Sequence, residues 1–144
     1  FNFTDNFNFS FNNISLVNFD VRGNKLSGSI PSQLFLLPNL QSVSLSINAF
    51  EGKLPESICG AKSVKVMLLD GLRSAIKGVV IPFTKISIGK MTDGSIPECM
   101  WKMSNLEILS LAGNGLRGTI GKEGYEMKSL INLTLSHNYL SGEI

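Results

Sequence analysis

The 144-residue sequence has few of the residues that build catalytic or metal centres, and little net charge. It contains one His, one Trp and two Cys, and its 13 basic and 11 acidic residues leave a formal net charge of +2. The basic residues are scattered among the acidic ones, whereas a nucleic-acid surface gathers Lys and Arg on one face. No apolar run approaches the ~18 residues of a membrane-spanning helix. Hydrophobic residues make up 43% of the chain, which is enough for one continuous core.

A pattern of apolar residues, Asn and Gly recurs at intervals of 24 residues. Residues 106–120, LEILSLAGNGLRGTI, show it most completely, and residues 130–144 repeat it. Two earlier copies begin at Leu16 and Leu40 in the same frame. Self-similarity at a fixed period indicates a solenoid, in which each repeat packs against its neighbours.

Each copy contains a short segment with the period of a strand. Residues two apart on a strand lie on the same face, so alternate apolar positions point inward. The inward set is Phe19, Val21, Val43, Leu45, Met67, Leu69, Ile86, Ile88, Leu109, Leu111, Leu133 and Leu135. We expect parallel strands near residues 16–22, 40–46, 64–70, 85–88, 107–112 and 131–136.

An Asn follows each of four predicted strands, where the chain turns away from the sheet. These residues are Asn24, Asn48, Asn114 and Asn138. A side-chain amide at such a turn can bond backbone groups that would otherwise lack partners, so we expect a structural Asn ladder. The Gly four residues later allows a backbone that a Cβ would obstruct, and a Pro in several copies starts the return segment.

Together these residues resemble the plant-type leucine-rich repeat of receptor-like kinase and receptor-like protein ectodomains and of polygalacturonase-inhibiting proteins. The best copies are residues 37–55 and 103–121. The resemblance implies an α/β solenoid, a right-handed superhelix with a parallel sheet on the concave face and short helical or 3-10 turns on the convex face. It also implies about six repeats with an irregular pair in the middle.

The repeat frame divides one solenoid domain, residues 1–144, into four parts. We expect a degenerate N-terminal turn at 1–15, regular repeats at 16–69, an irregular island or short repeat at 70–97, and regular repeats at 98–144. The frame fails after Leu69, because Leu72 stands where Asn is expected. Residues 1–13 can also be a low-complexity tail, although their five Phe would then leave apolar surface in water. The chain lacks paired-Cys caps, so we expect it to be a segment of a longer protein.

The predicted concave face carries mainly small polar residues. The candidate partner-binding set is Asp20, Arg22, Ser44, Ser46, Leu68, Asp70, Lys85, Ser87, Ser110, Thr134 and Ser136. Such a face can bind a partner, but an exposed strand also tolerates short polar residues without any ligand. Aromatic and Arg side chains dominate most interfaces, and this set contains only Arg22.

Two classes of function therefore remain. The first is a non-catalytic extracellular module that recognises a protein, peptide or glycan. The second is a structural scaffold or spacer in a cell wall, matrix or filament, whose partners are neighbouring repeats or chains. We expect no enzymatic activity, cofactor, metal, nucleic-acid partner or membrane contact within this segment. The Gly-x-Gly-x-x-Gly at 113–118 fits the repeat better than a dinucleotide site, and His137 has no catalytic partners.

Four N-x-S/T sequons favour a secreted or cell-surface protein. They are centred on Asn2, Asn8, Asn13 and Asn132.

The two cysteines follow repeat-starting prolines, with Cys59 after Pro55 and Cys99 after Pro97. Two regular repeats would separate these turns by ~10 Å, too far for the Cα separation of ~4.4–6.8 Å in a disulfide. If residues 82–97 lack a convex segment, the two turns become neighbours and the thiols can meet. The alternatives are a Cys59–Cys99 disulfide and two unpaired cysteines in a reducing compartment.

Overall fold

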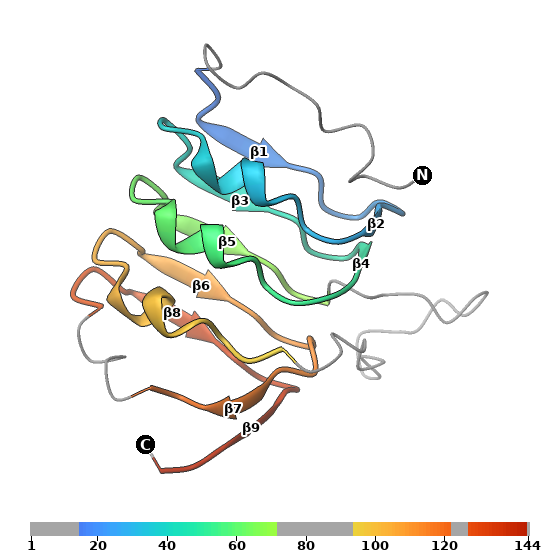
Figure 1. Ribbon diagram of the computed structural model, residues 1–144, viewed down its shortest axis with the longest axis vertical. Coiled ribbons are helices and arrows are strands. Elements are labelled where there is room, and N and C mark those ends of the chain that lie inside the picture. Colours follow the sequence, from blue (N-terminus) through green and yellow to red (C-terminus); the bar gives the residue numbers. More distant parts are fainter. Residues whose placement is uncertain (1–14, 72–93, 122–126, 144) are drawn as a thin grey trace.

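The computed structural model describes residues 15–71, 94–121 and 127–143. Its main sheet consists of β1 (Asn18–Asp20), β3 (Ser42–Ser44), β5 (Val66–Leu68), β6 (Ile108–Ser110) and β8 (Asn132–Thr134). All neighbours are parallel, in the order β1-β3-β5-β6-β8. Each turn of the chain lays the next strand beside the previous one (Figure 1), so the fold is the expected α/β solenoid.

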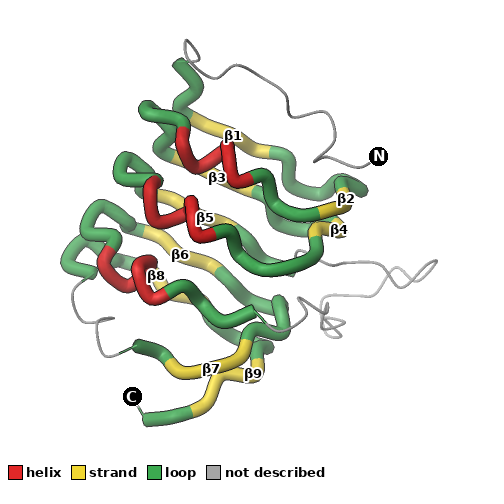
Figure 2. The backbone as a smooth tube through the Cα atoms, in the orientation of Figure 1, coloured by secondary structure: helices red, strands yellow, loops and turns green. Residues whose placement is uncertain are grey.

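Within the described ranges, three 3-10 helices cover one face of the main sheet (Figure 2). They are η2 (Ser32–Leu36), η3 (Glu56–Gly60) and η4 (Glu98–Lys102). Each begins directly after a proline, namely Pro31, Pro55 or Pro97, whose ring fixes φ at the start of the turn. The convex turns are therefore the short 3-10 segments that the sequence predicts.

The core lies between the sheet and the 3-10 helices. Met67 and Leu109 point into it from adjacent strands, and Ile58 and Met100 meet them from the helices, all with no exposed surface. Trp101 is 1% exposed and is the largest fully buried side chain in the described part of the chain. The inward position Leu133 is an exception at 39% exposure, because among the described residues β8 has only one neighbouring strand in the sheet.

The order of the sheet differs from the expected order at its centre. β1, β3 and β5 pair at the 24-residue period, but β5 pairs directly with β6, so Met67 lies opposite Leu109. The sheet leaves no place between these two strands for the expected strand at 85–88. Residues 85–88, with the inward positions Ile86 and Ile88, lie outside the described residues.

Two small parallel sheets on the flank of the solenoid were missed by the sequence analysis. One pairs β2 (Ser27–Gly28) with β4 (Ala49–Phe50), and the other pairs β7 (Arg117–Thr119) with β9 (Tyr139–Ser141). Their partners are 22 residues apart instead of 24, as for Gly28 opposite Phe50. Strands of two or three residues are too short to show a period-two pattern.

Glycines in and just beyond the flank strands explain the repeated Gly of the sequence pattern. Gly28, Gly52, Gly118 and Gly142 all adopt φ between 90° and 105°, a region that side chains with a Cβ rarely enter. At Gly142 a Cβ would also lie 3.0 Å from Thr119 Cγ2. In the described part of the chain, no helix has the length and apolar character needed to cross a membrane.

Candidate partner-binding face

The open face of the main sheet is the side turned away from the 3-10 helices (Figure 2), and it corresponds to the predicted concave face. Its residues alternate with buried ones, so Val66 and Leu68 flank the fully buried Met67. Because the strands pair in register, open-face side chains form columns across the sheet. One column is Asn18, Ser42, Val66, Ile108 and Asn132, and the next is Asp20, Ser44, Leu68, Ser110 and Thr134.

The centre of the open face is apolar. Val66 and Leu68 of β5 and Ile108 of β6 are half-buried, and Val66 lies directly opposite Ile108. The sequence analysis included Leu68 but missed Val66 and Ile108. The period-two alternation around Met67 and Leu109 was the signal that could have found them.

An ion pair borders this apolar centre where β5 and β6 begin. Lys65 Nζ lies 3.0 Å from Glu107 Oε1, and the Glu107 backbone N–H donates to the Lys65 carbonyl at 2.8 Å. The side chains are 52% and 37% exposed, so solvent screens the pair and its effect on stability is small. It places one charge of each sign beside the apolar centre.

Asp70 borders the apolar centre at the opposite end of the strands. Its carboxylate accepts hydrogen bonds from Ser110 Oγ and, at 2.8 Å, from the Ala112 backbone N–H. Its own backbone N–H donates to Ser46 Oγ at 3.0 Å. Asp70 therefore ties together three neighbouring repeats, a structural role in addition to the partner-binding role that the sequence suggested.

Asp20 and Arg22 form a second charged feature at the β1 end of the open face. Arg22 Nη2 donates to Asp20 Oδ2 at 2.7 Å, and Arg22 Nε reaches both carboxylate oxygens at 3.0 Å. These side-chain hydrogen bonds lower the pKa of Asp20 and raise the pKa of Arg22, and a hydrogen bond from the Arg22 backbone N–H lowers the pKa of Asp20 further. Both side chains are about half exposed, so a partner can reach the pair.

The remaining predicted positions differ in accessibility. Ser44 and Ser46 are 4% and 6% exposed, so they offer almost no surface, contrary to the pattern. Both side chains are short, and Ser46 Oγ packs against the neighbouring repeat, where it accepts a hydrogen bond from the Asp70 backbone N–H at 3.0 Å. Thr134 is half-buried and Ser136 is exposed. Lys85 and Ser87 lie outside the described residues.

The ladder asparagines bond backbone groups of their own and neighbouring repeats. Asn48 Nδ2 donates to the carbonyls of Val21 and Leu45 at 2.9 and 2.8 Å, and its Oδ1 accepts from Leu26 N–H at 3.1 Å. Asn138 repeats this arrangement, and Asn114 Nδ2 likewise donates to carbonyls of its own and a neighbouring repeat, whereas among the described residues the exposed Asn24 bonds only carbonyls of its own repeat.

The Gly-x-Gly-x-x-Gly segment belongs to this turn. Gly113 and Gly115 flank the buried Asn114, and both adopt φ of 69°. The backbone geometry of the repeat turn therefore accounts for both glycines. His137 is exposed at the corresponding position beside Asn138 and has a φ of 57°.

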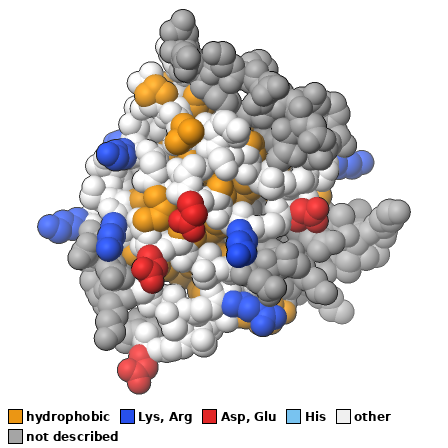
Figure 3. Space-filling model, in the orientation of Figure 1, with side chains coloured by type: hydrophobic (Ala, Val, Ile, Leu, Met, Phe, Trp, Pro, Cys, Tyr) orange, Lys and Arg blue, Asp and Glu red, His pale blue; other side chains and the backbone are white. Residues whose placement is uncertain are grey.

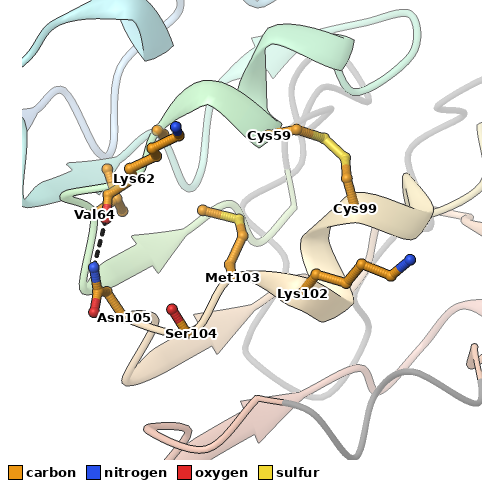
Figure 4. Close-up of a pocket in the computed structure, with 9 residues that line it drawn as sticks. Cys59, Lys62, Val64, Cys99, Lys102, Met103, Ser104 and Asn105 are labelled. Carbon is orange, nitrogen blue, oxygen red and sulfur yellow. Dashed lines mark hydrogen bonds between the residues drawn. A yellow bond between two sulfur atoms is a disulfide. The ribbon is translucent and has the colours of Figure 1, made fainter.

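A disulfide joins Cys59 of η3 to Cys99 of η4 on the convex side (Figure 4). The two Cα atoms are 5.6 Å apart, within the usual range for a disulfide. The bond is possible because β5 and β6 are neighbours, which brings the turns after Pro55 and Pro97 together. The predicted staple is therefore present, and unpaired cysteines are excluded in this structure.

The convex side beside the disulfide has an open pocket of about 370 Å³ (Figure 4). Lys62 and Lys102 line it, but their ammonium groups lie well apart, and Asn105 Nδ2 donates to the Lys62 carbonyl at 2.8 Å. Glu56 lies with the two cysteines in a group whose ligand atoms are within 4.8 Å, but the disulfide uses both sulfurs. Charged side chains of both signs are spread over the convex face (Figure 3). This side therefore gathers neither a metal site nor a patch of one charge among the described residues.

Comparisons with known proteins agree with the repeat assignment. The Leucine Rich Repeat family profile matches residues 15–37 and 39–61. Receptor-like protein 35 of Arabidopsis thaliana is 30% identical over 87% of this chain, and the match covers 14% of that protein. The chain thus spans about one seventh of the length of such curated relatives.

Solved structures extend the likeness to three dimensions. The LRR ectodomain of the plant membrane receptor kinase GASSHO1/SCHENGEN3 from Arabidopsis thaliana, in complex with CASPARIAN STRIP INTEGRITY FACTOR 2, matches with a TM-score of 0.71 and 28% identity. That match covers 90% of this chain and 13% of the other.

A second solved structure is the Arabidopsis receptor kinase HAESA in complex with the peptide hormone IDA and the co-receptor SERK1. It matches with a TM-score of 0.58 and 34% identity, over 90% of this chain and 23% of the other. The repeat period, the parallel sheet, the proline-started 3-10 turns and these matches lead to one assignment. The chain belongs to the plant-type leucine-rich repeat proteins.

Proposed function

We propose that the open face is a recognition surface for a peptide or protein, in the extracellular part of a longer receptor-like protein. The observation that carries the proposal is the apolar centre formed by Val66, Leu68 and Ile108. Half-buried apolar side chains on a solvent-facing sheet give up further water-exposed area when a partner covers them, and that is favourable at about 25 cal/mol per Å². The surface is non-catalytic.

The charged borders of the apolar centre add directional contacts. The Lys65–Glu107 pair lies at one end of β5 and β6, and Asp70 lies at the other end. An extended peptide that crosses the strands can place an apolar side chain on the centre and polar groups on either border. The structure of the receptor kinase HAESA in complex with the peptide hormone IDA, which resembles this chain, supports this kind of partner over a glycan.

The disulfide and the sequons support an extracellular location. Disulfides persist in oxidising compartments and are rare in the cytosol. The Cys59–Cys99 bond therefore favours a secreted or cell-surface protein, as do the receptor relatives.

A charge placed in the apolar centre tests the proposal. We would select binders to the secreted protein from a random-sequence peptide library and measure their affinities for Ile108→Asp and Leu36→Asp. Leu36 is a matched control, because it is an apolar residue with 63% exposure on the convex side. We expect the Ile108 change to weaken binding at least tenfold and the Leu36 change to leave it within twofold.

The same experiment distinguishes recognition from a scaffold role. If no peptides are enriched, or if the selected peptides bind both variants as well as the parent protein, the open face is not the recognition surface. Circular dichroism of both variants checks that the fold is retained. The scaffold or spacer alternative then becomes the better account.

A further inference from the structure

Asn132 is a sequon residue that the fold places on the open face. It is the first residue of β8, followed by Leu133 and Thr134, and it is exposed. Thr134 Oγ1 donates to Asn132 Oδ1 at 3.3 Å. In the described part of the chain, Asn132 Nδ2 makes no hydrogen bond, in contrast to the buried ladder residues Asn48 and Asn114. The other sequons, at Asn2, Asn8 and Asn13, lie outside the described residues.

We propose that Asn132 carries an N-linked glycan that stands on the open face and limits the partner-binding surface on the β8 side. An exposed carboxamide whose nitrogen has no protein partner can carry a sugar without loss of a native hydrogen bond. The Leu133 side chain points to the opposite face, so the glycan does not compete with core packing.

The register of the sheet places this glycan beside the apolar centre. Asn132 lies directly opposite Ile108 on the neighbouring strand, and adjacent strands are ~4.8 Å apart. A sugar on Asn132 Nδ2 therefore borders Ile108 from the β8 side. The other residues of that column, Asn18, Ser42, Val66 and Ile108, are not sequon residues, so within this column only the β8 position can carry a glycan.

The sugar donor for this modification is an oligosaccharide linked to a polyisoprenyl diphosphate carrier. A bond forms between Asn132 Nδ2 and the anomeric carbon of the first sugar, while the bond from that carbon to the diphosphate oxygen breaks. One proton leaves Nδ2 and the carrier departs as the free diphosphate. The reaction belongs to the secretory route, so occupancy depends on the extracellular location in the proposed function but not on any partner.

Peptide mapping of the secreted protein tests occupancy. Glycosidase treatment in heavy-oxygen water would mark each formerly glycosylated Asn as labelled Asp, and mass spectrometry would assign the label to a residue. We expect label at Asn132, loss of that label in Thr134→Ala, and its retention in Thr134→Ser, because Ser also completes a sequon. An unlabelled Asn132 peptide from protein that carries the Cys59–Cys99 disulfide would overturn the proposal without affecting partner recognition.

Thiol labelling tests the position of the glycan. In Ile108→Cys, a bulky maleimide reagent should react several-fold faster after removal of the glycan by the additional change Asn132→Gln. The Asn18→Cys thiol, at the far end of the same column, should react at equal rates in both backgrounds. Equal rates at position 108 would show that the glycan does not border the apolar centre and would remove the second half of the proposal.

Discussion

The residue that precedes each ladder position has a positive φ in every described repeat. Gly23, Ile47, Gly71, Gly113 and His137 all have φ between 52° and 69°. The backbone N–H of four of them donates to a carbonyl of the next repeat, which continues the sheet past the strand ends. Gly meets this requirement without strain, but Ile47 is β-branched and a genuine outlier in this region.

Replacement of Ile47 by Asn should stabilise the protein. Ile47 has a φ of 59° and is 55% exposed, so little packing is lost and a strained backbone is relieved. Asn tolerates the left-handed region, and we expect a gain of about 0.5–1 kcal/mol in the free energy of unfolding. Ile47→Val keeps the β-branch and should give no gain. Chemical denaturation checks both, and a destabilised Asn variant would show that Ile47 contributes packing that outweighs the strain.

The Asn ladder can be tested at a buried and an exposed position. Asn114 is 1% exposed and donates to the carbonyls of Leu69 and Leu111 at 2.7 and 3.1 Å. Asn114→Ala would leave both buried carbonyls without this donor, and we expect a loss of roughly 1–3 kcal/mol. Asn24→Ala should cost less, because water can reach the exposed Asn24 site. Equal melting temperatures for Asn114→Ala and the parent protein would count against the ladder.

The Asp20–Arg22 pair predicts a local pH dependence. Hydrogen bonds from Arg22 hold the pKa of Asp20 below its ordinary value of 3.8. Since the folded-state pKa is the lower one, the pair's contribution to stability is present above pH 3.8 and is lost as pH falls through the folded-state pKa. NMR titration should place the Asp20 midpoint below 3.8, and Arg22→Gln should move it back towards that value. An unchanged midpoint would show that the pair does not persist in solution.

At the scale of secondary-structure elements, the repeat pattern predicted the five strands of the main sheet and the proline-started turns. Their prediction succeeded because alternation around residues such as Met67 and Leu109 is a strong local signal. The flank strands and the columns of the open face depend on how neighbouring repeats are offset, which no single repeat encodes. Asp70 shows the limit of prediction from a single repeat, because its partners Ser110 and Ala112 are 40 and 42 residues away in the sequence. The broken register after Leu69 hid that proximity.

Asp70 should matter for the coupling of the repeats on either side of it. Asp70→Ala would remove the acceptor for Ser110 Oγ and Ala112 N–H, and hydrogen bonds to a charged group contribute about 1.5–3 kcal/mol each. We expect a loss of roughly 2–4 kcal/mol, below the simple sum because water can enter the half-buried site. Asp70→Asn keeps an acceptor oxygen and should lose less than half as much. Equal losses would indicate that the charge, and not the bonding geometry, stabilises this junction.

At the scale of the whole molecule, each repeat contacts only its neighbours, so stability depends on every junction between repeats. The junction between β5 and β6 is the irregular one, since 42 residues separate paired positions there in place of 24. The Cys59–Cys99 disulfide crosses the same junction on the convex side, opposite to Asp70. The sequence indicated the staple only conditionally, because the pairing depends on which repeats are neighbours.

Removal of the disulfide should therefore destabilise the molecule as a whole. The bond closes a loop with a sequence separation of 40 residues, which corresponds to about 4 kcal/mol on the chain-entropy model. Cys59→Ser combined with Cys99→Ser should lower the free energy of unfolding by that order, and a reducing agent should act similarly on the parent protein. The double variant is its own control, because reductant should leave its stability unchanged. A thiol titration of the unfolded, unreduced parent should detect no free thiol. Two free thiols, or a double variant as stable as the parent, would mean that Asp70 and the core hold the β5–β6 junction without the staple.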